Sequence, residues 1–109
     1  MSDILSQLTA TLEQRKNTDA EVSYVAQLHK KGLNKILEKI GEESTEVVLA
    51  AKDAAASGNT DEFVAEVADL WFHCMVALSH LNTDANDVLA VLEQRFNLSG
   101  LDEKASRNS

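Results

Sequence analysis

The chain has 109 residues, with no proline, four glycines and an aromatic content of only 5%. This length and composition favour a single domain made of α-helices over a β-sandwich or a barrel. With 18 acidic and 10 basic residues, the formal charge is −8, which argues against nucleic acid as a partner.

Five helices are expected along the chain. Their approximate ranges are 3–16, from 21 or 23 to 31, 33–57, 61–81 and 84–97. The tripeptide Asn-Thr-Asp, at 17–19, 59–61 and 82–84, precedes a helical pattern each time, and its threonine or aspartate can cap the first backbone N–H groups. Gly32 and Gly58 follow the second and third helices as stop signals.

The two long helices should form the centre of an all-α fold. Only about three residues join 33–57 to 61–81, so these helices are expected to pack antiparallel as a hairpin within a helical bundle. We expect one domain over 1–98 and a polar tail over 99–109 that a bound substrate could order. No apolar run approaches the roughly 18 residues of a membrane span. The first residues lack the apolar core of a signal peptide, so a cytoplasmic location is expected.

The helix expected over 33–57 carries carboxylates on or beside the side that should be buried. Its apolar stripe has a spacing of three or four residues and includes Leu33, Ile36, Ile40, Val47 and Ala50. Glu43 occupies the position missing from this stripe, and Glu46 lies one turn further on. Taken alone, the string from Glu42 to Glu46 is typical of a solvated helix face.

The helix expected over 61–81 is apolar nearly all round, so it should be largely buried. From residue 63 to residue 78, its only polar residues are Glu66, Asp69 and His73, which share one side. Buried carboxylates without partners cost several kcal/mol or stay protonated. Because few cations lie nearby in the sequence, a divalent ion is the simpler remedy, and oxygen ligands favour Mg²⁺, or alternatively Mn²⁺, over zinc.

Basic residues form a second group. Lys31, Lys35 and Lys39 recur every four residues and lead towards the carboxylates, while Lys104 and Arg107 lie in the tail. A solvated stripe of this kind is unremarkable, but beside a metal site the same lysines can hold phosphate groups.

Two further residues have open roles. His73 either orients a carboxylate from outside the ligand shell or is a hydrogen-bonded core residue. Cys74, the only cysteine, most simply fills a buried apolar position.

Three blocks of the sequence resemble the phosphoribosyl-ATP pyrophosphohydrolase family, within the MazG-like all-α nucleoside-triphosphate pyrophosphohydrolases. They are residues 23–51, with Glu42-Glu43-x-x-Glu46, residues 66–78, with Glu66-x-x-Asp69, and the tail block 99–107, which is the most family-specific. The resemblance implies Mg²⁺-dependent hydrolysis of 1-(5-phosphoribosyl)-ATP to 1-(5-phosphoribosyl)-AMP and pyrophosphate, the second step of histidine biosynthesis. It also implies a homodimer or a larger homo-oligomer.

The resemblance also implies roles for individual residues. The expected metal ligands are Glu43, Glu46, Glu66 and Asp69. The expected catalytic acids are Glu42, Glu43 and Glu46, with Glu42 acting either outside the ligand shell or on a second ion. The expected substrate contacts are Ser23, Tyr24, Lys31, Lys35, Lys39, Lys104 and Arg107. The chain departs from the family pattern at 17–22 and at Trp71-Phe72, and neither departure touches the acidic motifs.

Three alternatives compete with this interpretation. One is a house-cleaning pyrophosphohydrolase for free nucleoside triphosphates, although the tail block argues against it. Another is a non-enzymatic helical dimerisation module whose acids are merely interfacial. The third, a di-iron carboxylate bundle, needs Glu-x-x-His pairs, and none occurs in this sequence.

Overall fold

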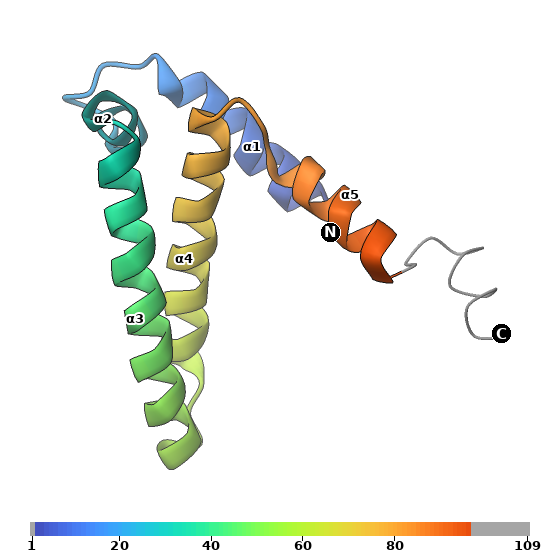
Figure 1. The fold of residues 1–109 in the computed structure, drawn as a ribbon. Helices are drawn as coiled ribbons and strands as arrows, with labels where there is room; N and C mark the ends of the chain where they lie inside the picture. The colour runs from blue at the N-terminus through green and yellow to red at the C-terminus, as the bar shows by residue number, and fades with distance from the viewer. Residues whose placement is uncertain (1, 97–109) are drawn as a thin grey trace, which may run out of the picture.

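A computed structural model describes residues 2–96, and within this range every regular element is a helix. The helices are α1 (Ser2–Lys16), α2 (Tyr24–Lys31), α3 (Leu33–Ser57), α4 (Asp61–His80) and α5 (Ala85–Phe96) (Figure 1). The predicted all-α class is therefore confirmed, with boundaries close to the expected ones. The tail over 99–109, with Lys104 and Arg107, lies outside the described residues, so the expected division at residue 98 stays a prediction.

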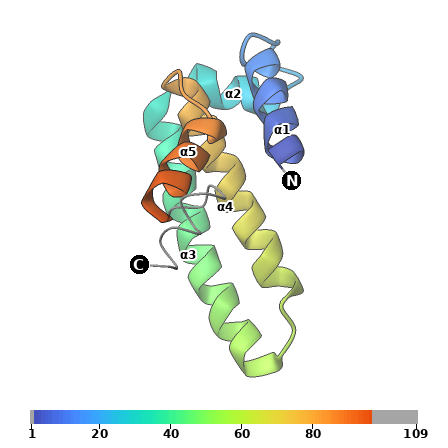
Figure 2. The same ribbon diagram turned by 90° about the vertical axis from the view of Figure 1, so that its right-hand side faces the viewer.

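The centre of the fold is the antiparallel hairpin of α3 and α4, as the short connection predicts (Figures 1 and 2). Gly58 ends α3 in the left-handed conformation, with φ 79°, and its N–H donates to the carbonyl of Ala54 at 2.8 Å. This is the position where glycine avoids the Cβ clash that other residues suffer. The tight turn starts α4 only a few residues later, so the two helices lie side by side along their length.

The helix starts differ in part from the predicted caps. Ser23, rather than Glu21, precedes α2, and its hydroxyl accepts from the N–H of Ala26 at 3.2 Å. Asp84 caps α5 as expected, since its carboxylate accepts from the N–H of Asn86 at 2.8 Å. The first Asn-Thr-Asp does not cap a helix, because the Asp19 carboxylate accepts from the N–H of Glu21, ahead of α2. At the second, the side chain of Asn59 accepts from the N–H of Asp61, so the predicted cap by Thr60 or Asp61 is wrong.

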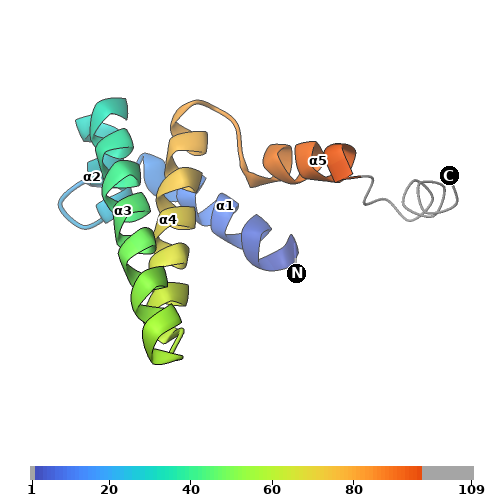
Figure 3. The ribbon, with the colours of Figure 1, turned by 60° about the horizontal axis from the view of Figure 1, so that its bottom comes forward.

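The hydrophobic core lies at the end of the hairpin where α3 begins and α4 ends. Its buried members come from all five helices and are Leu12, Val25, Leu28, Ile36, Met75, Val76 and Ala85. Helices α1 and α5 lie on the α4 side of the hairpin, away from α3 (Figures 1 and 3). Along its length α5 buries only Ala85, so most of its apolar side chains stay open.

The expectation that α4 is largely buried is wrong for the single chain. Within α4, the buried residues are His73, Met75, Val76 and Ser79, all in its second half. In the first half α3 covers one side only. Val64 in that half and Trp71 at the start of the second half are each 60% exposed. Cys74 is half-buried rather than buried, and this burial raises the pKa of its thiol.

None of the helices that the structure describes is both long enough and apolar enough to cross a membrane.

Candidate active site

Three of the four predicted metal ligands meet across the hairpin. Glu43 comes from α3 and Glu66 and Asp69 from α4, and each offers a carboxylate oxygen within 4.8 Å of the other two. Glu66 and Asp69 are three residues apart on one helix, so their side chains share a face. The antiparallel packing of α3 places Glu43 opposite that face. We call these three residues the acidic cluster.

The acidic cluster has the chemistry of a site for a hard divalent cation. Glu43 and Glu66 are half-buried and Asp69 is exposed, and none of the three forms an ion pair within residues 2–96. Partial burial is the main cause that raises the pKa of Glu66, followed by a hydrogen bond with Glu62 and by the charges of Glu43 and Asp69. Three oxygen donors with uncompensated negative charge suit Mg²⁺ or Mn²⁺ better than zinc.

The other two acids of the string from Glu42 to Glu46 do not join this cluster. Glu46, the fourth predicted ligand, is exposed and its carboxylate is not among the clustered groups. Glu42 is also exposed, and it accepts a hydrogen bond from the ammonium group of Lys39 at 3.0 Å, the main cause that lowers its pKa. Successive helical residues differ by about 100° around the axis, so Glu42 faces the lysine while Glu43 faces α4.

The three predicted lysines differ in how near they lie to the acidic cluster. Lys39 is closest along α3, because it lies one turn before Glu43. Its hydrogen bond to Glu42 is the main cause that raises its pKa, with smaller contributions from Tyr24 and Glu43. Lys35 lies one turn earlier and forms an ion pair with Glu38 at 3.5 Å. Lys31 is exposed at the end of α2. These three lysines, which we call the lysine stripe, thus run from the acidic cluster towards α2.

Ser23 and Tyr24 stand at the start of α2, but they differ in what they can offer a ligand. Ser23 is only 9% exposed and its hydroxyl already accepts from the N–H of Ala26 as the helix cap. Tyr24 is 46% exposed, and its hydroxyl hydrogen-bonds to Nε2 of His73 on α4 at 2.9 Å. Tyr24 therefore brings α2 to the same stretch of α4 that carries Asp69.

His73 is a residue whose role the sequence left open. It is 5% exposed and its Nδ1 lies 2.9 Å from the backbone carbonyl oxygen of Asp69. Of the two predicted roles, the hydrogen-bonded core histidine is the one observed, because the ring contacts the Asp69 backbone and not its carboxylate. The spacing of four residues between Asp69 and His73 could have indicated the hydrogen bond from the ring to the Asp69 backbone. It did not indicate that Tyr24 is the second hydrogen-bond partner of the ring.

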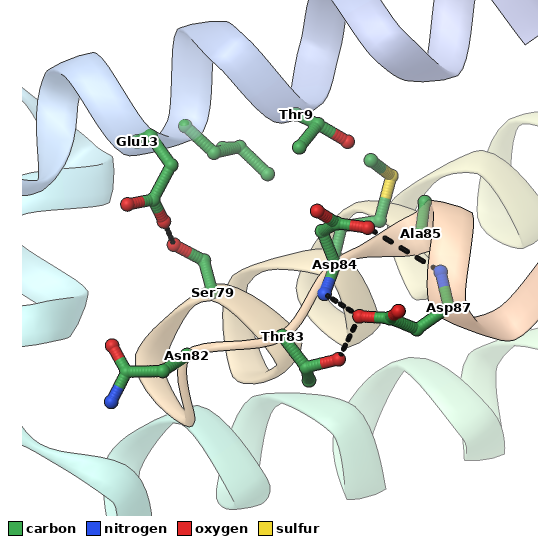
Figure 4. Close-up of a pocket in the computed structure, with 10 residues that line it drawn as sticks. Thr9, Glu13, Ser79, Asn82, Thr83, Asp84, Ala85 and Asp87 are labelled. Atoms are coloured by element: carbon green, nitrogen blue, oxygen red, sulfur yellow. Dashed lines mark hydrogen bonds between the residues drawn. The ribbon is translucent and has the colours of Figure 1, made fainter.

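A polar pocket lies at the C-terminal end of α4, away from the acidic cluster (Figure 4). It is lined by Thr9, Leu12, Glu13, Met75, Ser79, Asn82, Thr83, Asp84, Ala85 and Asp87. Ser79 is ten residues beyond Asp69, about 15 Å along the helix. The carboxylate of Glu13 accepts from the Ser79 hydroxyl, and Asp84 and Asp87 bond each other's backbone N–H groups at the start of α5. This pocket contains no predicted site residue and is a joint between α1, α4 and α5.

A comparison with protein-family models gives one match that spans most of the chain. The model for phosphoribosyl-ATP pyrophosphohydrolase matches residues 5–96, which include the acidic cluster and most or all of every described helix. The chain belongs to this family. Phosphoribosyl-ATP pyrophosphohydrolases are hydrolases that act on a phosphoric anhydride, and the chain is accordingly an enzyme of this class. The tail block, which lies beyond residue 96, is outside the matched region.

Proposed function

We propose that the chain hydrolyses 1-(5-phosphoribosyl)-ATP to 1-(5-phosphoribosyl)-AMP and pyrophosphate, the second step of histidine biosynthesis, and that the reaction depends on Mg²⁺. Two observations together support this proposal. The family match covers residues 5–96, and Glu43, Glu66 and Asp69 converge within 4.8 Å inside the matched region. The convergence supports the metal dependence, because three carboxylates so close together repel one another and a divalent cation would relieve that repulsion.

Glu43, Glu66 and Asp69 would hold the metal ion, and Glu46, one turn beyond Glu43, is retained as a fourth candidate ligand. When bound, a divalent cation supplies positive charge to the triphosphate oxygens and makes a nearby water more acidic. One water is consumed, the bond between the α- and β-phosphates breaks, and pyrophosphate leaves. Glu46 or Glu42, whose carboxylates are exposed, would take the proton of the attacking water.

The lysine stripe would bind the remaining phosphate groups of the substrate. Lys39 and Lys35 now pair with Glu42 and Glu38 on the surface, and such exposed pairs are weak enough to exchange for a phosphate. Lys31 extends the stripe towards α2, and Lys104 and Arg107 in the tail stay predicted contacts. If a phosphate replaced Glu42 as the partner of Lys39, the Glu42 carboxylate would also be released from its ion pair.

The test is pyrophosphate release from phosphoribosyl-ATP, compared with a panel of free nucleoside triphosphates and repeated with a chelator. We expect release from phosphoribosyl-ATP that stops on chelation and returns with Mg²⁺. Glu43→Gln and Asp69→Asn should each lose most of the activity, while Glu38→Gln removes the same charge from an exposed site on α3 and should retain it. Preferential hydrolysis of free triphosphates would support the house-cleaning alternative instead, and activity in excess chelator would contradict the metal dependence.

We also propose that a second copy of the chain covers the apolar side of α4. Trp71 lines three adjoining apolar hollows, together with side chains of α1, α4 and α5. The large exposed apolar residues on these helices are Ile4, Val64, Trp71, Val88, Val91, Leu92 and Phe96. A continuous apolar surface of this kind is typical of a protein–protein interface, and the single chain does not cover it. Sedimentation should show a dimer or larger species for wild type and a shift towards monomer for Trp71→Arg.

A further inference from the structure

A hydrogen-bonded chain links the start of α2 to the acidic cluster through His73. The Tyr24 hydroxyl lies 2.9 Å from Nε2 of His73, and Nδ1 of the same ring lies 2.9 Å from the carbonyl oxygen of Asp69. The Tyr24 ring also stacks on Phe72, with centroids 6.2 Å apart, and meets the His73 ring edge-on. Tyr24 is therefore held by two neighbouring residues of α4 while 46% of its surface stays exposed.

The partners of the ring decide where the protons of this chain lie. A carbonyl oxygen can only accept, so Nδ1 of His73 must carry the hydrogen that it donates to Asp69. In a neutral imidazole the other nitrogen is then an acceptor, and the Tyr24 hydroxyl donates its proton to Nε2. The Tyr24 oxygen has no further proton to give, but it keeps lone pairs that can accept.

The surroundings of Tyr24 indicate what can use those lone pairs. Lys39 lies one turn before Glu43 on α3, and Tyr24 is among the groups that raise the pKa of Lys39, after the larger effect of Glu42. The same hydroxyl cannot donate to a phosphate oxygen, which at neutral pH offers mainly acceptors. A ligand group that suits this oxygen is a hydroxyl, such as those of a ribose ring, while Lys39 beside it suits a phosphate.

We propose that His73 is a positioning residue. It engages the Tyr24 proton and leaves the Tyr24 oxygen, near the stretch of α4 that carries Asp69, as an acceptor for a ribose hydroxyl of the substrate. This inference rests on the proposed function, because it takes a phosphoribosyl nucleotide as the ligand. The contact lies away from the phosphorus that reacts. The hydrogen bond from the ribose to Tyr24 should therefore stabilise the bound substrate and the transition state equally. Its loss should raise KM with little change in kcat.

The chain offers a matched control for a purely structural role. His29 on α2 and His80 on α4 form a second hydrogen bond between the same two helices, with their Nδ1 atoms 3.0 Å apart. This pair lies near the end of α4, seven residues beyond His73, or roughly 10 Å along the helix. His29→Asn therefore breaks a comparable connection between α2 and α4 without touching Tyr24.

The experiment measures KM and kcat for phosphoribosyl-ATP, with melting temperature, in five variants. Tyr24→Phe keeps the stacked ring but loses the oxygen. His73→Asn keeps a donor for the Asp69 carbonyl but is too short to reach Tyr24, whereas His73→Gln places an amide oxygen near the position of Nε2. The double variant Tyr24→Phe/His73→Asn completes a cycle, and His29→Asn is the control.

We expect Tyr24→Phe and His73→Asn each to raise KM roughly 3- to 10-fold, the value of one lost hydrogen bond, with kcat within about twofold of wild type. The double variant should be no worse than either single one. His73→Gln should recover most of the loss, and His29→Asn should lower the melting temperature and leave KM unchanged. In the wild-type protein, nitrogen NMR of the His73 ring should show a protonated Nδ1 and an unprotonated Nε2.

Other results would overturn the inference. They are a normal KM in Tyr24→Phe or His73→Asn, an equal rise of KM in His29→Asn, or a proton on Nε2 of His73. The proposed function fails separately, and takes this inference with it, if the wild-type chain releases no pyrophosphate from phosphoribosyl-ATP. Activity in wild type with unchanged KM in the variants overturns the positioning role alone.

Discussion

Glu43→Gln removes one of the three acidic-cluster carboxylates, and its effect on Mg²⁺-dependent stability can be worked out from the geometry. A ligand that binds only the folded chain stabilises it by about 2.7 kcal/mol at 100 times its dissociation constant. With an unfolding entropy of about 2.1 cal/mol/K per residue, 109 residues give about 0.23 kcal/mol/K. The wild-type melting temperature should therefore rise by about 12 °C at that Mg²⁺ concentration.

The loss in the variant follows from Coulomb's law. The clustered oxygens lie within 4.8 Å of one another, so an ion held by all three would be closer still to each. A divalent ion and one carboxylate about 4 Å apart attract by about 2 kcal/mol even at the dielectric constant of water. Glu43→Gln should thus bind Mg²⁺ roughly 30-fold more weakly, and the same Mg²⁺ concentration should raise its melting temperature by only about 4 °C.

Far-UV circular dichroism melts with chelator and with Mg²⁺ measure both values. Glu38→Gln, which removes the same charge from an exposed ion pair, should keep the wild-type response. In chelator, Glu43→Gln should melt no lower than wild type. The substitution removes the Glu43 charge, and this relieves the repulsion between carboxylates that contributes to the raised pKa of Glu66. A full Mg²⁺ response in Glu43→Gln, or none in wild type at any concentration, would refute this reasoning. The response of Glu46→Gln then decides whether that residue joins the ligands.

The fold makes two further predictions. Gly58→Ala should lower the free energy of unfolding by about 1 kcal/mol, because φ is 79° at this position. Gly41→Ala should raise the free energy of unfolding by about 1 kcal/mol, because alanine favours a helix and its Cβ would meet nothing within 4 Å. Urea unfolding measures both changes. Burial, followed by the charges of His80 and Lys16, lowers the pKa of His29 below 6.5, so its folded ring binds a proton less readily than the unfolded chain. Stability should therefore fall as the pH drops below about 6.5, and the part of this fall that disappears in His29→Gln measures the contribution of His29.

Helix positions were largely predictable because their signals are local. Apolar spacing, glycine stops and the short connection between 57 and 61 indicated the helices and the α3–α4 hairpin, and the structure confirms them. The caps were less predictable, since an Asn-Thr-Asp string offers three side chains to a few N–H groups. Asn59 and Asp84 accept within two of these strings, whereas Ser23, which caps α2, lies outside the first. Which side chain caps a helix depends on the backbone angles of each turn, and the amino-acid sequence of the turn alone does not specify those angles.

By itself, the sequence determined that acidic residues interrupt two apolar helix faces, and that Glu66 and Asp69 share one side. Helical periodicity is enough for both conclusions, because it relates residues on the same helix. Only the tertiary structure decided that Glu43 joins them while Glu46 stays exposed outside the cluster, and that His73 connects Asp69 to Tyr24. Those contacts depend on the axial register and rotation of one helix against another, which are set by packing over the whole core.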